Sequence, residues 1–288
     1  MIARSIASLY IINSTVFAAA VCISLFSAAS QADKKPIDDA KWFHQTQLPD
    51  GNSWFNNEQQ HYTNRIDNAY VSNGTLKIVA QKEPYTNQGK TKQYTSARLN
   101  SKFAFKYGRV EVRAKLPAGP GTWPAIWTLG KNVNELGAYW QTQGYGTTPW
   151  PACGEIDIME HWGSRQSFIQ SAMHTPSSFR DTVHKGEQYL ATASSQFHIY
   201  IMEWSSQQIA FSVDNKIHYR YQPEVKNART WPFDSEQYLI LNLAIEDAIY
   251  NNFDSAQMEI DYVRVFAIDS DNSDQPIWSD EFDQPNKT

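Results

Sequence analysis

Apolar and polar residues alternate with a period of two in many short segments of this chain. Such alternation predicts β-strands, because successive side chains of a strand point to opposite faces. Turn-forming pairs such as Asn73-Gly74, Ser205-Ser206 and Asp214-Asn215 separate several of these segments. The segments that alternate or run apolar are GTLKIVAQK (74–82), SARLNSKFAFKYGRVEVRAKLP (96–117), FHIYIMEWS (197–205), QIAFSVDN (208–215), YLILNLAI (238–245) and MEIDYVRVFAI (258–268).

Many short strands separated by turns are typical of two antiparallel sheets packed as a sandwich, so we predict an all-β fold. The chain has no internal repeat and no long amphipathic helix. Residues 130–154 are rich in Gly, Thr and Pro and form a long excursion between strands, and loops of this length usually shape a site. One domain over residues 33–288 accounts for the pattern.

Residues 1–32 differ from the rest of the chain and are predicted to be a signal peptide. No charged residue lies between Arg4 and Asp33, and the stretch 9–26 is mostly apolar. Ser30 and Ala32 are small residues at the two positions that a signal peptidase reads. We therefore expect a secreted protein, extracellular or periplasmic, after cleavage near Ala32.

Two other interpretations of this segment stay open. It approaches the length of a membrane span, although Asn13-Ser14-Thr15 interrupts it and favours a removable signal. A lipid on Cys22 is disfavoured by the large Val21 before it.

Removing residues 1–32 takes away one arginine and no acid, so the formal charge of -5 becomes -6. Cys153 then has no partner for a disulfide, and we interpret it as a small core residue.

Composition narrows the classes of partner. Aromatic residues make up 14% of the chain, and they fit pleated sheets and can stack on flat apolar ligands. The net charge is negative and no basic patch is present, so a nucleic-acid partner is not expected.

The stretch GEIDIMEHWG (154–163) carries three acids among isoleucines. Strand alternation places Glu155 and Asp157 on one face and would place Glu160 on the other. A β-bulge around Ile158-Met159 inserts one residue and returns Glu160 to the face of the first two. Three carboxyls on one face repel one another, and this cost indicates chemistry.

Paired carboxyls on a rigid strand, in a cleft lined with aromatics, fit glycoside hydrolysis with retention. One acid attacks the anomeric carbon, and the other protonates the leaving oxygen and therefore needs a higher pKa. A simpler interpretation is that the three acids lie on an exposed strand edge. The isoleucines between the acids disfavour it, because they imply that the other face of the strand lies in a core. A Ca²⁺ or Mg²⁺ site is another alternative, but it would need ligands from outside the motif.

The motif EIDIME (155–160) resembles the signature of glycoside hydrolase family 16, in the form with the extra bulge residue that its laminarinases, agarases and carrageenases share. The resemblance covers nearly all of residues 33–288 and implies a β-jelly-roll sandwich with a concave substrate cleft. The flanking segments that look like laminarinase segments, in the expected order, are WFNNEQQHYTNR (54–65), YGRVEVRAKLP (107–117), GTWPAIWTLG (121–130), WPFD (231–234), YLILNLAI (238–245) and MEIDYVRVF (258–266).

The resemblance implies roles for individual residues. Glu155 matches the nucleophile, Glu160 the acid/base and Asp157 the assisting acid. Trp123 and Trp127 match tryptophans that form sugar platforms, although either could be a core aromatic. They lie four apart, so an uninterrupted strand would place both on one face.

Four polar residues match cleft positions of the family. Asn56 and Glu58 would bond sugar hydroxyls, with a turn-stabilising role as the alternative. Arg98 would bond a hydroxyl, hold the nucleophile ionised or be a plain surface charge. His174 is given a supporting role near the acid/base.

The resemblance also implies a structural Ca²⁺ away from the cleft, with no cofactor needed for catalysis. Asp261 matches the calcium-binding aspartate, and Gly74 and Glu281 match segments that supply backbone carbonyls. The ion would stabilise the fold, because only the folded chain assembles its ligands.

The order of one segment departs from the family. Members usually begin with a Trp-Ser-Asp-Glu-Phe strand, but here IDDAKW (37–42) comes first and IWSDEFDQPNKT (277–288) follows the last strand. We interpret this as a circular permutation, with 277–283 forming a strand of the same sandwich. The alternative is the beginning of a second tandem copy.

Three functions are consistent with these features. The first is a monomeric, endo-acting hydrolase of β-1,3 bonds in laminarin-type β-glucans, with mixed-linkage β-1,3-1,4-glucan as a secondary substrate. The second is a non-catalytic β-glucan-binding lectin, which would be expected to lack one or both glutamates of the motif. The third is a hydrolase of a marine galactan, whose sulfated forms would favour a basic cleft; the charge of -6 argues against it. Once the signal is removed, no membrane partner is expected.

Overall fold

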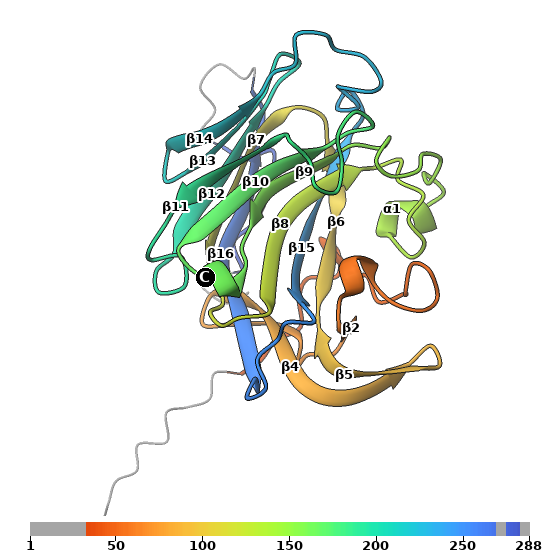
Figure 1. Cartoon of the computed structure of the whole chain (residues 1–288), viewed down its shortest axis with the longest axis vertical. Helices are drawn as coiled ribbons and strands as arrows, with labels where there is room; N and C mark the ends of the chain where they lie inside the picture. The colour runs from red at the N-terminus through yellow and green to blue at the C-terminus, as the bar shows by residue number, and fades with distance from the viewer. Residues whose placement is uncertain (1–32, 269–274, 283–288) are drawn as a thin grey trace, which may run out of the picture. The chain divides into compact units, whose positions relative to one another are not determined.

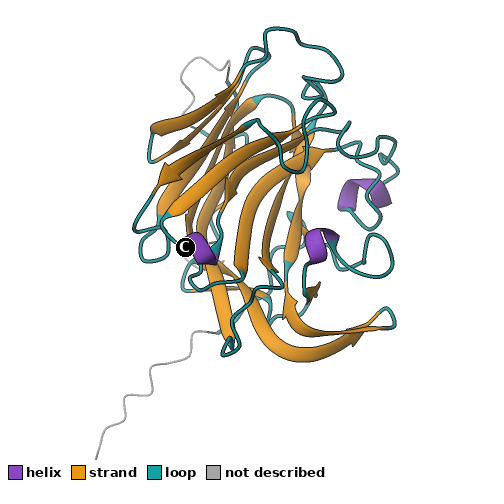
Figure 2. Ribbon diagram, in the orientation of Figure 1, coloured by secondary structure: helices purple, strands orange, loops and turns teal. Residues whose placement is uncertain are grey.

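Two packed β-sheets dominate the computed structural model, which describes residues 33–268 and 275–282 (Figures 1 and 2). These residues all belong to the unit Ala32–Thr288. The predicted signal peptide, residues 1–32, lies outside the described residues. In the described part of the chain, no helix is both long enough and apolar enough to cross a membrane.

The first sheet has seven strands, and every neighbouring pair is antiparallel. In spatial order its strands are β1 (Trp42–His44), β6 (Arg98–Phe105), β15 (Gln237–Ile245), β8 (Thr122–Gly130), β9 (Glu155–Glu160), β10 (Phe168–His174) and β11 (Lys185–Tyr189). The acidic motif forms β9, which therefore has a neighbour on each side.

The second sheet has ten strands and is antiparallel except where β2 pairs with β5. Its main path is β14 (Lys216–Tyr221), β13 (Ile209–Val213), β12 (His198–Trp204), β7 (Gly108–Lys115), β16 (Ser255–Phe266), β4 (Thr75–Asn87), β5 (Lys90–Ser96) and β2 (Gln60–Tyr62). Strand β3 (Ala69–Ser72) pairs with β4, and β17 (Trp278–Asp280) pairs with β16.

The prediction of an all-β sandwich is confirmed. All six predicted segments contain strands, and the described helices are short: η1 (Phe55–Asn57), α1 (Tyr139–Thr142) and η2 (Gly163–Arg165) (Figure 2). The Asp214-Asn215 turn has φ values of 49° and 64°, as a two-residue hairpin requires. The largest boundary error is at β4, which continues past Lys82 to Asn87 and forms a curved hairpin with β5 (Figure 1). Strand β16 also differs from the predicted segment 258–268, because it begins at Ser255 and ends at Phe266.

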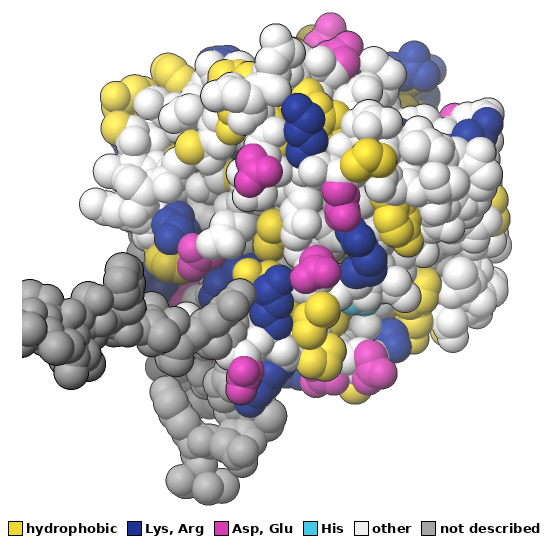
Figure 3. All heavy atoms as spheres, turned by 90° about the horizontal axis from the view of Figure 1, so that it is seen from below, with side chains coloured by type: hydrophobic (Ala, Val, Ile, Leu, Met, Phe, Trp, Pro, Cys, Tyr) yellow, Lys and Arg dark blue, Asp and Glu magenta, His cyan; other side chains and the backbone are white. Residues whose placement is uncertain are grey.

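The hydrophobic core lies between the two sheets. Strand β15 sends Leu239, Leu241 and Leu243 into it, while Asn242 and Ala244 lie on the opposite face and line a cleft. A smaller apolar cluster lies beneath the excursion 130–154 and includes Cys153, which is buried as predicted. The apolar faces thus pack the sandwich and leave one face of the seven-stranded sheet for polar groups. On the face of the molecule in Figure 3, basic and acidic side chains are interspersed.

The C-terminal strand β17 packs on its own chain, as predicted, but it spans Trp278–Asp280 and is shorter than the predicted 277–283. Ile277 before it is exposed, and residue 283 lies outside the described residues. Strand β17 pairs with β16, and Phe282 is buried after it. Trp42 donates its indole N–H to Asp280 Oδ2 at 2.8 Å, and the Trp278 ring meets the Trp42 ring edge-on with centroids 5.5 Å apart. The strand therefore lies beside both β16 and the N-terminal strand β1. The circular permutation itself stays a proposal.

Candidate active site

The predicted bulge in β9 is confirmed by the pairing of its neighbour β8. Trp127 pairs with Asp157 and Ile126 pairs with Met159, which leaves Ile158 as the extra residue. The register against β10 shifts at the same place. The last acid of the motif therefore returns to the face of the first two.

All three acids line a cleft of 560 Å³ on the exposed face of the seven-stranded sheet. The predicted residues Trp123, Trp127, Asn56, Glu58 and Arg98 line the same cleft. Both tryptophans are half-buried, so neither is a fully enclosed core aromatic. The other lining residues are Phe55, Ala125, Val133, Asn134, Glu135, Trp150, Arg180, Asn242 and Ala244.

Neutral N–H donors hold the two glutamates of the motif. Trp150 donates its indole N–H to Glu155 Oε2 at 2.9 Å. Glu160 accepts from the Trp123 indole and from the Gln170 amide, both at 3.2 Å. Neither Trp150 nor Gln170 was predicted from the sequence, in which the excursion 130–154 was the only signal for Trp150. Each carboxyl is thereby fixed in orientation toward the cleft.

His174 lies beside the other two acids. Its Nε2 is 3.5 Å from Glu155 Oε1 and 3.2 Å from Asp157 Oδ2. The prediction that His174 lies near Glu160, the expected acid/base, is therefore wrong. In β10, Gln170 faces Glu160, and His174 lies four residues further along the strand. Ligand atoms of Glu155, Asp157 and His174 lie within 4.8 Å of one another and could also hold a metal ion.

Burial dominates the electrostatics of the three acids. Loss of solvent raises the pKa of Glu160 to about 8, and repulsion from Asp157 adds to the rise. Burial likewise raises the pKa of Glu155 and of Asp157, and repulsion from Asp157 adds to the rise at Glu155. The site therefore retains protons at neutral pH, which supplies the acid that glycoside hydrolysis needs.

Arg98 is buried, with 3% of its side chain exposed, so its interpretation as a surface charge is wrong. It makes an ion pair with Glu135 at 2.8 Å, and its guanidinium lies 4.8 Å from the centre of the Trp127 ring. Its ionic partner is thus Glu135 of the excursion, and the described hydrogen bonds and ion pairs include none between Arg98 and Glu155.

A hydrogen-bonded chain links Glu58 to Trp127. Tyr62 donates to Glu58 Oε2 at 2.9 Å, Asn242 donates to the Tyr62 hydroxyl at 3.0 Å, and the Trp127 indole donates to Asn242 Oδ1 at 2.7 Å. The chain fixes the plane of the Trp127 ring. Asn56 has φ 55°, a backbone conformation that asparagine tolerates, and its side chain lines the cleft.

The three predicted calcium residues converge at one edge of β16. Strand β4 pairs with β16 up to Ile260 and β17 pairs from Val263, so Asp261 lies where the segments of Gly74 and Glu281 meet. One carboxylate with backbone carbonyls is a donor set that suits Ca²⁺. The Asp261 carboxylate lies 2.5 Å from the Arg113 guanidinium, so an ion there would have to replace this pair.

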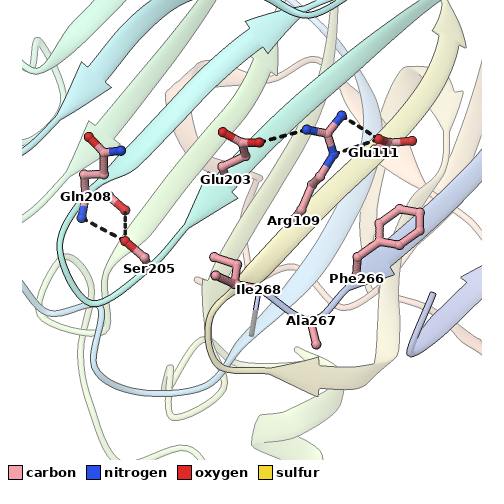
Figure 4. A pocket seen from close by; sticks show the side chains of 8 residues that line it. All are labelled: Arg109, Glu111, Glu203, Ser205, Gln208, Phe266, Ala267 and Ile268. Atoms are coloured by element: carbon pink, nitrogen blue, oxygen red, sulfur yellow. Dashed lines mark hydrogen bonds and ion pairs between the residues drawn. The ribbon is translucent and has the colours of Figure 1, made fainter. Parts of the chain in front are cut away.

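Another hollow, of 670 Å³, lies on the ten-stranded sheet (Figure 4). Arg109 points between Glu111 and Glu203 and pairs with both. Because Arg109 pairs with both carboxylates, the residues drawn include no charged group without a partner.

An antiparallel β-sandwich with a cleft of aromatics around two glutamates and an aspartate defines a glycoside hydrolase of the double-carboxylate type. The model of glycosyl hydrolases family 16 matches residues 56–264. The chain therefore belongs to glycoside hydrolase family 16, as the resemblance implied.

Individual relatives agree with this assignment. The chain is 37% identical over 282 residues to a beta-glucanase of Rhodothermus marinus, which covers 88% of this chain and 93% of that protein. A solved structure of LamA from Zobellia galactanivorans with laminaritriose and laminaritetraose is 46% identical, with a TM-score of 0.74 and coverage of 81% and 95%. A glucan endo-1,3-beta-glucosidase A1 of Niallia circulans is 34% identical over 260 residues, and this chain spans 36% of its length.

Proposed function

We propose that this hydrolase cleaves β-1,3 linkages within laminarin-type β-glucans, with retention at the anomeric carbon. The observation that carries the proposal is the bulged strand β9, which presents Glu155, Asp157 and Glu160 together in one aromatic cleft. The bound laminari-oligosaccharides named for the Zobellia structure support the choice of glucan.

In the proposed mechanism, the Glu155 carboxylate attacks the anomeric carbon while Glu160 gives its proton to the leaving oxygen. The glycosidic bond breaks and a bond between the sugar and Glu155 forms. Glu160, now a carboxylate, takes a proton from water, and the resulting hydroxyl displaces Glu155. Burial, together with repulsion from Asp157, keeps the pKa of Glu160 raised, and the indole N–H of Trp150 orients the nucleophile.

Export and the monomeric state are part of the proposal. The apolar segment before Asp33 supports export, and the paired acids support hydrolysis over lectin-like binding. A galactan substrate is the second candidate within the enzyme class, because family membership alone does not fix the polymer.

Reducing-sugar release on laminarin, lichenan, agarose and carrageenan tests the proposal. We expect laminarin to give the largest kcat/KM and lichenan a smaller one, with a Glu155→Gln variant inactive on all four. Release from agarose or carrageenan alone would overturn the choice of substrate. Binding of laminarin without any release would favour the lectin.

A further inference from the structure

The extra residue of the β9 bulge is held by a side chain of the next strand. Ser171 of β10 donates its hydroxyl to the carbonyl oxygen of Ile158 at 2.7 Å, and this bond is buried. The residues on either side of Ser171 pair with Asp157 and with Glu160, so Ser171 faces the bulge itself. A bulge interrupts the ladder, and this hydroxyl supplies a partner to a carbonyl within the interruption.

A histidine from the opposite sheet supports the same serine. His218 of β14 places Nε2 2.9 Å from Ser171 Oγ. A serine hydroxyl has one proton, and here it goes to the Ile158 carbonyl, so His218 must donate from Nε2. Burial lowers the pKa of His218 to about 4, which keeps the ring neutral and in this tautomer at neutral pH. The two bonds thus connect the bulge to the ten-stranded sheet.

We propose that Ser171, oriented by His218, is a positioning residue for Glu160. The peptide group that follows Ile158 lies two residues before Glu160, and its orientation sets the direction in which the Glu160 side chain leaves the strand. Fixing the carbonyl of Ile158 fixes that peptide group. The inference rests on the proposed acid/base role of Glu160.

The position of this bond in the strand makes the effect selective. Glu155 and Asp157 precede the bulge and are held by Trp150 and His174. Loss of the Ser171 hydroxyl therefore disturbs proton donation to the leaving group and leaves the nucleophile in place. Selectivity of this kind can be measured, because a good leaving group departs without a proton.

The experiment compares kcat/KM of Ser171→Ala on laminarin and on a dinitrophenyl laminaribioside, since kcat/KM of a retaining enzyme reports the first displacement. We expect a loss of at least tenfold on laminarin and less than twofold on the aryl glycoside. Glu160→Ala should show the same pattern more strongly, and Ser171→Thr, which keeps a hydroxyl, should recover much of the laminarin activity.

Ser101→Ala is the matched control. Ser101 of β6 is buried and donates to the Phe103 carbonyl at 2.7 Å, at another register shift away from the three acids. We expect this variant to lower the melting temperature as Ser171→Ala does, with kcat/KM on both substrates unchanged.

Equal losses on both substrates, or unchanged kcat/KM on laminarin in folded Ser171→Ala, would overturn the proposal for Ser171. If Glu160→Ala itself shows no leaving-group selectivity, the role of Glu160 fails instead. If Ser171→Ala does not fold, the His218→Leu variant is tested instead. We expect it to lose kcat/KM on laminarin more than on the aryl glycoside, by a smaller factor than Ser171→Ala. An equal loss on both substrates would refute the inference.

Discussion

The C-terminal strand should stabilise the sandwich through one buried hydrogen bond in particular. Trp42 is 1% exposed, and its indole N–H donates to Asp280 Oδ2 at 2.8 Å. Replacing Asp280 with alanine leaves this donor buried without its partner. Asp280 also lies 3.4 Å from Lys41 Nζ, but that contact is partly exposed and contributes less.

A lost hydrogen bond that leaves a buried donor unsatisfied costs about 1–3 kcal/mol. We take about 2 kcal/mol for Asp280→Ala, because the acceptor is a carboxylate and the donor is enclosed. For a domain of this size, that free energy corresponds to a fall in melting temperature of about 4–8 °C. Asp280→Asn retains an oxygen acceptor and should lose less.

A double-mutant cycle isolates the bond. Trp42→Phe removes the donor, so Asp280→Ala should cost less than about 1 kcal/mol in that background. Equilibrium unfolding in urea or guanidinium would give the four free energies of unfolding. If Asp280→Ala lowers the free energy of unfolding equally with Trp42 and with Phe at position 42, the reasoning is refuted. The bond between Trp42 and Asp280 would then not stabilise the packing of β17 on the core.

Three further outcomes follow from the site and from the predicted calcium site at the edge of β16. Azide should restore turnover of an activated glycoside to Glu155→Gly and give the α-glycosyl azide, whereas a β-azide would assign Glu155 as the acid/base. Because burial raises the pKa of Glu160 from 4.5 to about 8, the folded protein binds the proton more tightly than the unfolded chain, and stability is lost as pH rises through this window. Glu160→Gln should therefore raise the melting temperature at pH 9 and change it little at pH 4. At about 1.4 kcal/mol per pKa unit, the gain in the free energy of unfolding at pH 9 is a few kcal/mol. A gain at pH 4 alone would contradict this. Added Ca²⁺ should raise the melting temperature and a chelator should lower it, with Asp261→Asn insensitive to both; a parent protein that ignores both would exclude the site.

The sequence predicted what depends on local periodicity. The alternation around Glu155 and the change in spacing before Glu160 were enough to place the bulge and the common face of the acids. The end of β4 was missed, because Lys82–Asn87 is polar and lies in an edge hairpin, where no apolar alternation marks the strand.

What could not be predicted depends on the register between strands and on loop conformation. Trp150 reaches Glu155 only through the path of the excursion, and Gln170 faces Glu160 only because of the pairing of β10 with β9. The same register misled the placement of His174, whose position in the sequence says nothing of which acid it meets. The ion pair of Arg98 with Glu135 joins segments 37 residues apart, and alternation carries no information about such a pair.

The placement of His174 provides an asymmetry that the motif itself lacks. Burial raises the pKa of both glutamates, and each accepts N–H bonds from neutral side chains, so these features alone do not separate nucleophile from acid. The His174 Nε2 lies 3.5 Å from Glu155 Oε1 and 3.2 Å from Asp157 Oδ2, and the described ion pairs include none between His174 and Glu160. An N–H at Nε2 that points to these two carboxyls stabilises their charged forms. Repulsion from Asp157 raises the pKa of both glutamates, but Glu155 is the one that has His174 in contact to offset it. The proton is therefore favoured at Glu160, where protonation of the leaving group requires it.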